Sequence, residues 1–377
     1  MNLINEIFEI LKSANEYYIV PLILSFILVP LCKKIGYFLG IYAQENSRTV
    51  HSGKIVRIGG LAIYLSFMIS LVLVIEVDTT FLAIVIGGFV VFIGGLIDDI
   101  FNIKPLLKVA FQLSGALIAI YFGDINLNQI TIPFIFIDTS SISIIISLVW
   151  IIGVSNAINL IDGLDGLSGG ISFIILVVIA CIGFFMGRLD SSMISTVLAF
   201  SILGFLPYNF FPASIFMGDC GALFIGYMIA CISLLGFKTS AFITLGFPIV
   251  ILAVPLADTA LAIIRRKIKG QRISEADKEH LHHVLMLKMG LSHRITVLVL
   301  YLVTALFGIS ALLTFYNKTL GILMLGLLSF LAWIFIEATG MINSKFHPLI
   351  GLSRRLTKHP KKRENAIFVA NKIEIKK

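Results

Sequence analysis

Eleven stretches of apolar residues run through this chain, and each approaches the length needed to cross the hydrocarbon core of a lipid bilayer. A crossing helix needs about 20 mostly apolar residues. Because lipid offers no partner for backbone N–H and C=O groups, such stretches fold as α-helices. We expect membrane-spanning helices at 17–32, 59–75, 81–97, 106–122, 142–158, 167–187, 194–209, 221–237, 240–264, 295–316 and 319–337.

The composition also favours an all-α integral membrane protein. Hydrophobic residues make up 58% of the 377 residues and charged residues only 13%, whereas soluble domains carry about 25% charged residues. Residues 1–18 contain acids and no basic segment, so they do not resemble a cleaved signal peptide. The four cysteines are scattered without paired spacing, which predicts no disulfide framework. We expect one polytopic catalytic domain over 1–340 and a basic cytoplasmic tail over 341–377.

Positive charge predicts the orientation of the helices. With eleven spans, all but four of the 29 Lys and Arg residues fall on one side of the membrane, and the exceptions are Lys12, Arg188, Lys238 and Lys318. Basic residues collect on the cytoplasmic side. We therefore expect a multi-pass protein of the cell inner (cytoplasmic) membrane, with its N-terminus outside and its C-terminus in the cytoplasm. The net charge of +8 is explained by topology, and we expect no nucleic-acid partner.

Five aspartates gather in the loops on the basic side. Asp98 and Asp99 end one apolar run, Asp162 and Asp165 lie in NAINLIDGLDGLSGG, and Asp219 lies in FMGDCG. Carboxylates that meet at one site repel one another unless a cation lies among them. Oxygen ligands favour Mg²⁺, with Mn²⁺ as the alternative, and Mg²⁺ commonly binds one or two carboxylates plus substrate phosphates.

Phosphate-binding groups lie on the same side. His280, His282 and His283 occur together in a long basic loop, and such groups suit phosphate oxygens, whereas no nearby cysteine supports zinc. Acids, Mg²⁺ and cations together indicate a site for a nucleotide diphosphate and for phosphoryl transfer. Its position at the membrane surface indicates a lipid phosphate as the second substrate.

Structural interpretations compete with this one. The acids also fit a helix cap, solvated loop positions or a turn, and a cation-coupled transporter also uses acids within membrane helices. A transporter predicts acids near the centres of the spans and an inverted repeat. Here the acids gather at one face and no repeat is evident, which favours the enzyme.

Taken together, these motifs resemble the polyprenyl-phosphate N-acetylhexosamine-1-phosphate transferase family. The resemblance runs from about residue 48 to 301 and includes the Asp98–Asp99 doublet, NAINLIDGLDGLSGG, FMGDCG, DTALAIIRR and HLHH in the family order. Members transfer a sugar phosphate from a UDP-sugar to a polyprenyl phosphate lipid and release UMP. The family's arrangement of eleven helices is the one counted here from apolar runs.

The resemblance also implies roles for individual residues. Asn159 and Asp219 resemble the Mg²⁺ ligands, and Asp98 and Asp99 resemble the acids beside the acceptor phosphate. The full predicted site is catalytic Asp98, Asp99, Asp162, Asp165, His282 and His283, substrate-binding Asn102, Lys108, Asn156, Asn209 and His280, and the metal ligands Asn159 and Asp219. The loop before Gly59 reads HSGKIVRIGG, where the family often has proline before the two glycines, so we leave His51 and Arg57 out.

The predicted donor is UDP-GlcNAc and the predicted acceptor is undecaprenyl phosphate, in the first membrane step of cell-envelope polysaccharide synthesis. HLHH preceded by EADKE is similar to the UDP-GlcNAc branch of the family. Another UDP-N-acetylhexosamine and UDP-MurNAc-pentapeptide are the alternatives. Direct attack by the lipid phosphate is preferred over a covalent intermediate, and a homodimer is left open.

Overall fold

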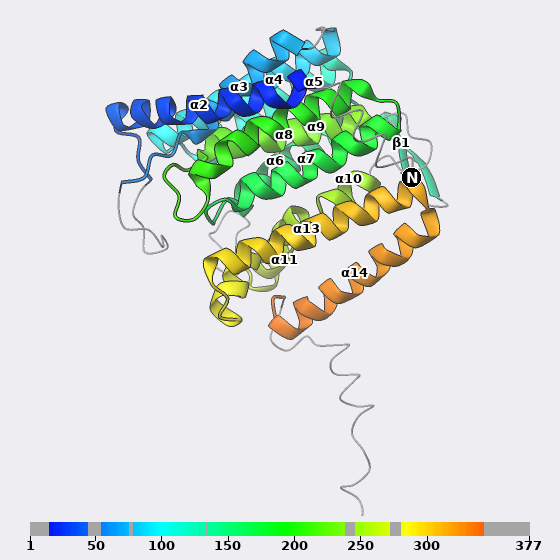
Figure 1. Cartoon of the computed structure of the whole chain (residues 1–377). Helices are drawn as coiled ribbons and strands as arrows, with labels where there is room; N and C mark the ends of the chain where they lie inside the picture. The colour runs from blue at the N-terminus through cyan, green and yellow to red at the C-terminus, as the bar shows by residue number, and fades with distance from the viewer. Residues whose placement is uncertain are drawn as a thin grey trace, which may run out of the picture.

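A computed structural model describes most of the chain as a bundle of long helices (Figure 1). It describes residues 15–43, 54–74, 78–127, 129–132, 135–237, 246–271 and 280–342. The long helices are α2 (Asn15–Leu39), α3 (Gly59–Val74), α4 (Thr79–Phe101), α5 (Pro105–Gly123), α6 (Ser143–Ile161), α7 (Leu167–Phe185), α8 (Leu189–Asn209), α9 (Gly218–Phe237), α11 (Ala253–Ile268), α13 (His293–Tyr316) and α14 (Lys318–Thr339). The short elements are η1 (Ser140–Ile142), α10 (Gly246–Ile251), α12 (Leu281–His283) and the π-helical turn η2 (Val284–Lys288).

Each of the eleven predicted spans overlaps a helix where the structure describes it, and residues 75 and 240–245 lie outside the described residues. In the described residues, nine helices have the length and composition to cross a membrane, and α3 is a shorter apolar helix. The stretch 240–264 contains α10 and α11, which are separated at Leu252. The single span predicted over this stretch is therefore divided into two helices in the structure. The chain is a multi-pass membrane protein by these criteria, while the count of eleven crossings stays a prediction.

The described residues are helical as predicted apart from one short β-hairpin, which connects α5 to η1 and α6. Strands β1 (Gln129–Ile132) and β2 (Ile135–Asp138) pair antiparallel, with Gln129 opposite Asp138 and Ile132 opposite Ile135. Alternating Ile and Thr residues suit a strand, but a four-residue strand is too short for its pattern to stand out between two apolar helices.

Helix α9 forms the centre of the bundle, and α3, α4, α6, α7 and α8 pack around it. Its most apolar window is 94% buried. Small residues allow this close packing, as is common between membrane helices. A Cβ atom added at Gly95 of α4 would lie 2.6 Å from the Cα atom of Cys220, and one added at Gly226 would lie 2.6 Å from the Cα atom of Ser155. The N-terminal end of α9 is therefore held against its neighbours.

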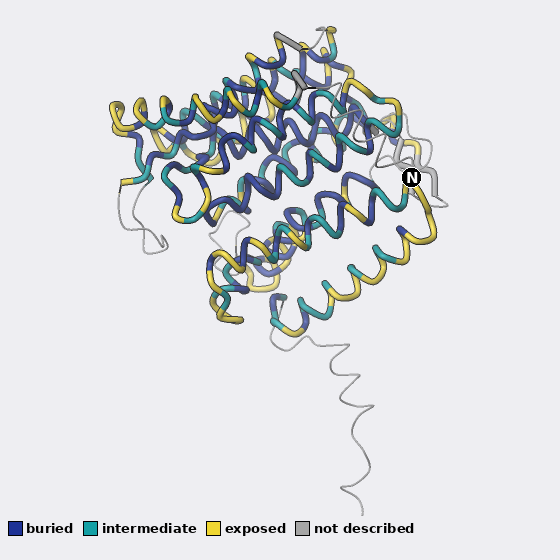
Figure 2. The backbone as a smooth tube through the Cα atoms, viewed as in Figure 1, coloured by how far each residue is buried: buried dark blue, intermediate teal, exposed yellow. Residues whose placement is uncertain are grey.

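Helix α14 lies at the edge and packs mainly against α13 (Figure 1). Only 6% of its apolar window is buried, and its surface is mostly exposed or half-buried, in contrast with α7 and α9 (Figure 2). Exposed Leu323, Leu327 and Phe330 give α14 the surface of a helix that faces lipid.

Candidate active site

The acidic doublet lies where α4 ends. Asn102 adopts a left-handed conformation with φ of 51°, and its N–H group donates to the Asp98 carbonyl oxygen at 2.8 Å. Asparagine is one of the few residues that adopt this conformation readily. The Asp98 carboxylate accepts the Ile103 N–H at 3.1 Å. Asn102 therefore ends the helix, and both buried aspartates lie in its last turn.

Asp99 joins α4 to the start of α9. Its carboxylate accepts the backbone N–H groups of Asp219 and Cys220, each at 2.9 Å. These N–H groups belong to the first turn of α9, where unpaired donors and the helix dipole favour a negative charge. Gly218 begins α9 with φ of +76°, and a side chain there would collide with the Arg57 carbonyl oxygen. The sequence MGDC therefore forms a helix start that a carboxylate from α4 caps.

Arg57 lies at the centre of this arrangement, although we left it out of the predicted site. Its Nε and Nη2 atoms lie 3.0 and 2.9 Å from Asp99 Oδ1, and Nη2 lies 3.7 Å from Asp219 Oδ1. Burial alone would lower the pKa of Arg57, but the charges of Asp99 and Asp219 outweigh it and raise the pKa. The segment that carries Arg57 is held by backbone bonds from Phe216 to Val56, from Gly59 to Phe216 and from Gly60 to Met217. Arg57 lies two residues before the Gly59–Gly60 pair, and a basic residue so close to this pair was the signal that could have identified it.

Lys108 supplies the second cation. Pro105 starts α5, and Lys108 in its first turn reaches back to Asp98, with Nζ 2.8 Å from Oδ2. It also pairs with Asp219. Asp98, Asp99, Arg57, Lys108 and Asp219 thus form one continuous cluster, which we call the ion cluster.

Asp162 adds another carboxyl group beside the ion cluster. Removal from water raises the pKa of Asp162 to about 8, and the charges of Asp219, Asp99 and Asp165 act in the same direction, while Arg57 opposes them. Among the residues that the structure describes, no hydrogen bond is recorded to the side chains of Asp162 or Asn159. Both groups are therefore free to bind a ligand.

Asp165 and Asn209 hold loops together. Asp165 accepts the Ala213 N–H at 2.9 Å, and its own N–H donates to His293 Nε2 at 3.2 Å. Asn209 accepts the Gly166 N–H at 3.1 Å and donates to the Ile215 carbonyl oxygen at 3.0 Å. The loop after α6 is thus fixed to the loop before α9.

Asn156 faces α5. Its Nδ2 atom donates to Gln112 Oε1 at 2.9 Å and to the Ile152 carbonyl oxygen at 2.8 Å. Gln112 is buried, and it follows Lys108 by four residues on the same face of α5. Gln112 is a further polar residue that the sequence analysis missed, and its spacing from Lys108 was the available signal.

The three predicted histidines approach the same end of the bundle from α12. His280 pairs with Asp258 of α11, and the rings of His282 and His283 lie 4.3 Å apart. His282 lies against Gly163, since a Cβ atom added there would be 2.6 Å from its Nε2 atom. Burial and the neighbouring His283 lower the pKa of His282 to about 3, which keeps this ring neutral. The structure therefore brings a histidine to the loop that carries Asp162 and Asp165.

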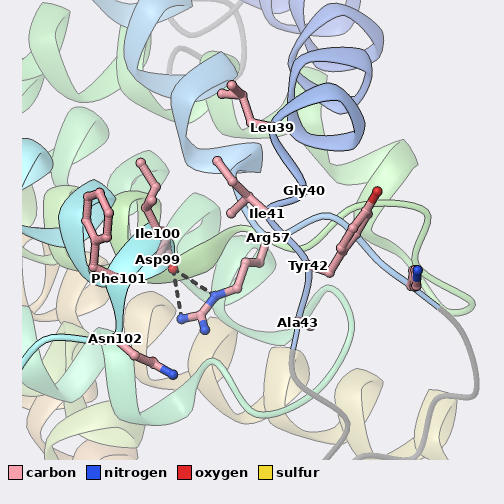
Figure 3. A pocket seen from close by; sticks show the side chains of 11 residues that line it. Leu39, Gly40, Ile41, Tyr42, Ala43, Arg57, Asp99, Ile100, Phe101 and Asn102 are labelled. Atoms are coloured by element: carbon pink, nitrogen blue, oxygen red, sulfur yellow. Dashed lines mark hydrogen bonds and ion pairs between the residues drawn. The ribbon is translucent and has the colours of Figure 1, made fainter.

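A pocket of about 560 Å³ opens beside Asp99 (Figure 3). Its polar wall includes Lys54, Arg57 and Asn102. Its apolar lining includes Leu39, Ile100 and Phe101 from the ends of α2 and α4, and Ile41 from the segment after α2. A charged end and an apolar side therefore meet in one pocket.

Metal binding by this site would rely on few protein ligands. In the described part of the chain, no group of three or more His, Cys, Asp or Glu side chains is placed to hold a metal ion. The donor set does fit Mg²⁺, which commonly takes one or two carboxylates together with substrate phosphates. When ionised, Asp98, Asp99, Asp162 and Asp219 carry four negative charges against the two positive charges of Arg57 and Lys108, which leaves an excess that a divalent cation would balance.

Fold and site together define a multi-pass membrane protein with a buried ion cluster at one end of its bundle. The sequence model described as Glycosyl transferase family 4 matches residues 81–237. A protein of Bacillus subtilis (strain 168), a probable undecaprenyl-phosphate N-acetylglucosaminyl 1-phosphate transferase, is 39% identical over 346 residues, which cover 90% of this chain and 96% of that protein. The chain belongs to glycosyl transferase family 4.

Two other relatives carry different substrate names. The decaprenyl-phosphate N-acetylglucosaminephosphotransferase of Mycobacterium leprae (strain TN) is 33% identical over 322 residues, covering 75% of this chain and 80% of that protein. The phospho-N-acetylmuramoyl-pentapeptide-transferase of Staphylococcus aureus (strain MSSA476) is 30% identical over 294 residues, covering 72% and 90%. The predicted family is thus confirmed, and its members differ in lipid and sugar.

Proposed function

We propose that this protein is a Mg²⁺-dependent enzyme that transfers N-acetylglucosamine-1-phosphate from UDP-GlcNAc to undecaprenyl phosphate and releases UMP. The observation that carries the proposal is the ion cluster at one end of a membrane bundle, in a chain whose relatives are named for this reaction. An anionic lipid and an anionic nucleotide sugar both require cations at a membrane surface.

In the proposed reaction, an oxygen of the lipid phosphate attacks the β-phosphorus of the UDP-sugar. A new P–O bond forms, the bond from that phosphorus to the bridging oxygen breaks, and UMP leaves with the electron pair. Asp219 and Asn159 are the proposed ligands of Mg²⁺, which when bound would neutralise charge on the diphosphate. Arg57 and Lys108 hold the acids in position, and a cluster assembled before the substrates bind supplies electrostatic stabilisation.

The contacts of the two adjacent acids support direct attack over a covalent intermediate. The carboxylate of Asp99 accepts two backbone N–H groups and the Arg57 guanidinium. That of Asp98 is paired with Lys108 and accepts the Ile103 N–H. These contacts occupy carboxylate oxygen atoms that a nucleophilic attack would need, even though burial raises the pKa of both acids, that of Asp99 to about 6. A phosphate monoester with a second pKa of about 6 is already largely ionised at neutral pH.

The pocket beside Asp99 supports an amphiphilic phosphate as the acceptor. Lys54 and Arg57 suit the phosphate, while Leu39, Ile41 and Phe101 suit the start of an apolar chain. Lys54 is exposed and lies 5.5 Å from the centre of the Tyr42 ring. We expect Lys54→Glu to raise the KM for the lipid several-fold and to leave the KM for the UDP-sugar nearly unchanged. Equal changes in the KM values for the lipid and for the UDP-sugar would show that this pocket does not bind the lipid acceptor.

The proposed location is the cytoplasmic membrane, with the site facing the cytoplasm. The Lys and Arg distribution supports this orientation, because the loops that carry the ion cluster are on the basic side. Cysteine-accessibility labelling of intact cells at exposed positions near Lys54 and Arg188 tests it. Labelling of the Lys54 side by a membrane-impermeant reagent would contradict the proposed orientation, because it would place that side outside the cell.

The decisive assay uses detergent-purified protein, undecaprenyl phosphate and a panel of UDP-sugars, and it measures UMP with and without Mg²⁺. UDP-GlcNAc is the expected donor, and Asp219→Ala is expected to abolish turnover without unfolding the protein. If UDP-MurNAc-pentapeptide were the one donor that released UMP, it would replace UDP-GlcNAc as the proposed donor. Absence of metal-dependent UMP from every donor would refute the function.

A further inference from the structure

Another buried polar contact lies outside the ion cluster, where α11 meets the histidine segment. Asp258 of α11 is 1% exposed. Its Oδ2 atom lies 2.8 Å from His280 Nδ1, and its Oδ1 atom accepts the Leu281 N–H at 2.7 Å. Because His280 is the N-cap of α12, one carboxylate fixes both the ring and the backbone at the start of this helix.

This contact also determines which nitrogen of His280 carries a proton. An ionised carboxylate only accepts hydrogen bonds, so the proton on Nδ1 points toward Asp258. The partner of one ring nitrogen sets the tautomer of the whole imidazole. Nε2 is then the ring's remaining polar atom.

The ring of His282 lies between His280 and the loop that carries Asp162 and Asp165. The rings of His280 and His282 are parallel within 4°, with centroids 5.9 Å apart. His282 is 3% exposed and lies against Gly163, and its Nδ1 atom has no hydrogen-bond partner among the described residues. The His282 ring packs against Gly163 and against the ring of His283, and it belongs to the segment that begins at His280.

Apolar packing secures the same junction. Leu261 of α11, Val284 of η2 and Met341 after α14 form a small buried cluster next to the histidine segment. The segment is therefore attached to α11 in two ways, through this apolar contact and through Asp258. Only the Asp258 contact also orients a histidine ring.

We propose that Asp258 is a positioning residue that holds the His280–His283 segment against the 162–166 loop and sets the tautomer of His280. This inference rests on the proposed function for its kinetic consequence, because the segment would then face the diphosphate of the UDP-sugar. The anchoring itself is a property of the fold and can be measured without turnover.

Three substitutions separate anchoring from orientation. Asp258→Ala removes both hydrogen bonds. Asp258→Asn can still accept the Leu281 N–H, but its amide N–H groups face His280 Nδ1 and demand the opposite tautomer. His280→Asn replaces the ring and can keep a donor toward Asp258. Asp78→Asn is the matched control, because Asp78 caps the opposite end of α4 by accepting the Phe81 N–H at 2.6 Å, and Asn caps helices as well as Asp.

The test combines hydrogen exchange with kinetics on the full-length protein. We expect Asp258→Ala to speed amide exchange in peptides covering 281–289, and Asp258→Asn, His280→Asn and Asp78→Asn to leave it near wild type. We expect Asp258→Asn to lower kcat/KM for UDP-GlcNAc about 10- to 100-fold, as loss of an orienting partner often does, and to change the KM for the lipid less than twofold.

If Asp258→Ala left amide exchange in peptides 281–289 unchanged, Asp258 would not anchor the segment. Wild-type kinetics in Asp258→Asn, or equal losses for both substrates, would overturn the tautomer role. If the wild-type protein released no UMP from any UDP-sugar, the proposed function would fail, and the exchange measurement would still decide whether Asp258 anchors the segment.

Discussion

Replacement of Arg57 by alanine tests how the ion cluster is held together. The substitution leaves the carboxylate of Asp99, whose side chain has no exposed surface, without its paired guanidinium. Removing one partner of a buried ion pair costs about 3–5 kcal/mol. The Arg57 side chain is 19% exposed, so water can partly replace it, and we expect the lower end of that range. About 3 kcal/mol corresponds to a loss of about 10²-fold in rate, if the whole cost falls on the assembled site.

Arg188 provides a matched control. Its Nη2 atom lies 2.9 Å from Asp190, the same distance as in the Arg57–Asp99 pair, but the two side chains are 25% and 47% exposed. Exposed pairs contribute about 0–1 kcal/mol. We expect Arg188→Ala to keep activity within about threefold of wild type.

The assay is UMP release at saturating Mg²⁺ and lipid, with thermal unfolding measured on the same preparations. Arg57→Lys is expected to recover part of the activity, since it restores the charge with a single donor group. If folded Arg57→Ala turned over UDP-GlcNAc within threefold of wild type, Arg57 would have no part in assembling the site.

Two further predictions concern the loop after α6. Gly163→Ala would place a methyl group 2.6 Å from His282 Nε2, so we expect at least a tenfold loss in kcat/KM for the UDP-sugar, whereas Gly153→Ala, which meets no atom within 4 Å, should be neutral. The pKa of Asp162 is raised from 3.8 to about 8, so the folded protein binds the proton more tightly than the unfolded chain, and this group lowers stability as pH rises from about 4 to 8. Without Mg²⁺, Asp162→Asn should raise the Tm at pH 8 and flatten its pH dependence, and an unchanged Tm profile would contradict the raised pKa.

The helices could be read from the sequence, because lipid requires every backbone hydrogen bond to be made within a helix. Each apolar run overlaps a helix in the residues that the structure describes. The β1–β2 hairpin was missed because its strands carry only four residues each. Local pattern is a weak guide for elements this short.

The site was only partly predictable. The topology predicted from the apolar runs placed the five aspartates on one side of the membrane. The structure brings Asp98, Asp99 and Asp219 into one cluster with Lys108. The pairing of Arg57 with Asp99 depends on the backbone contacts between residues 56–60 and 215–217, which no local pattern indicates. Likewise, the spacing of Asp165 and Asn209 could not reveal that both side chains bond to loop backbone.

The ion cluster has an electrostatic reason to be assembled from several helices. Asp98 and Asp99 lie at the C-terminal end of α4, where the helix dipole disfavours negative charge. The N-terminal end of α9 compensates by donating two N–H groups to Asp99, and Arg57 and Lys108 add positive charge.

The family match over 81–237 includes α4 from Phe81 on, all of α9 and Lys108, but neither Arg57 nor the histidine segment. A fragment limited to those residues would therefore keep the acids without Arg57, and we expect it neither to hold α4 against α9 nor to turn over a UDP-sugar.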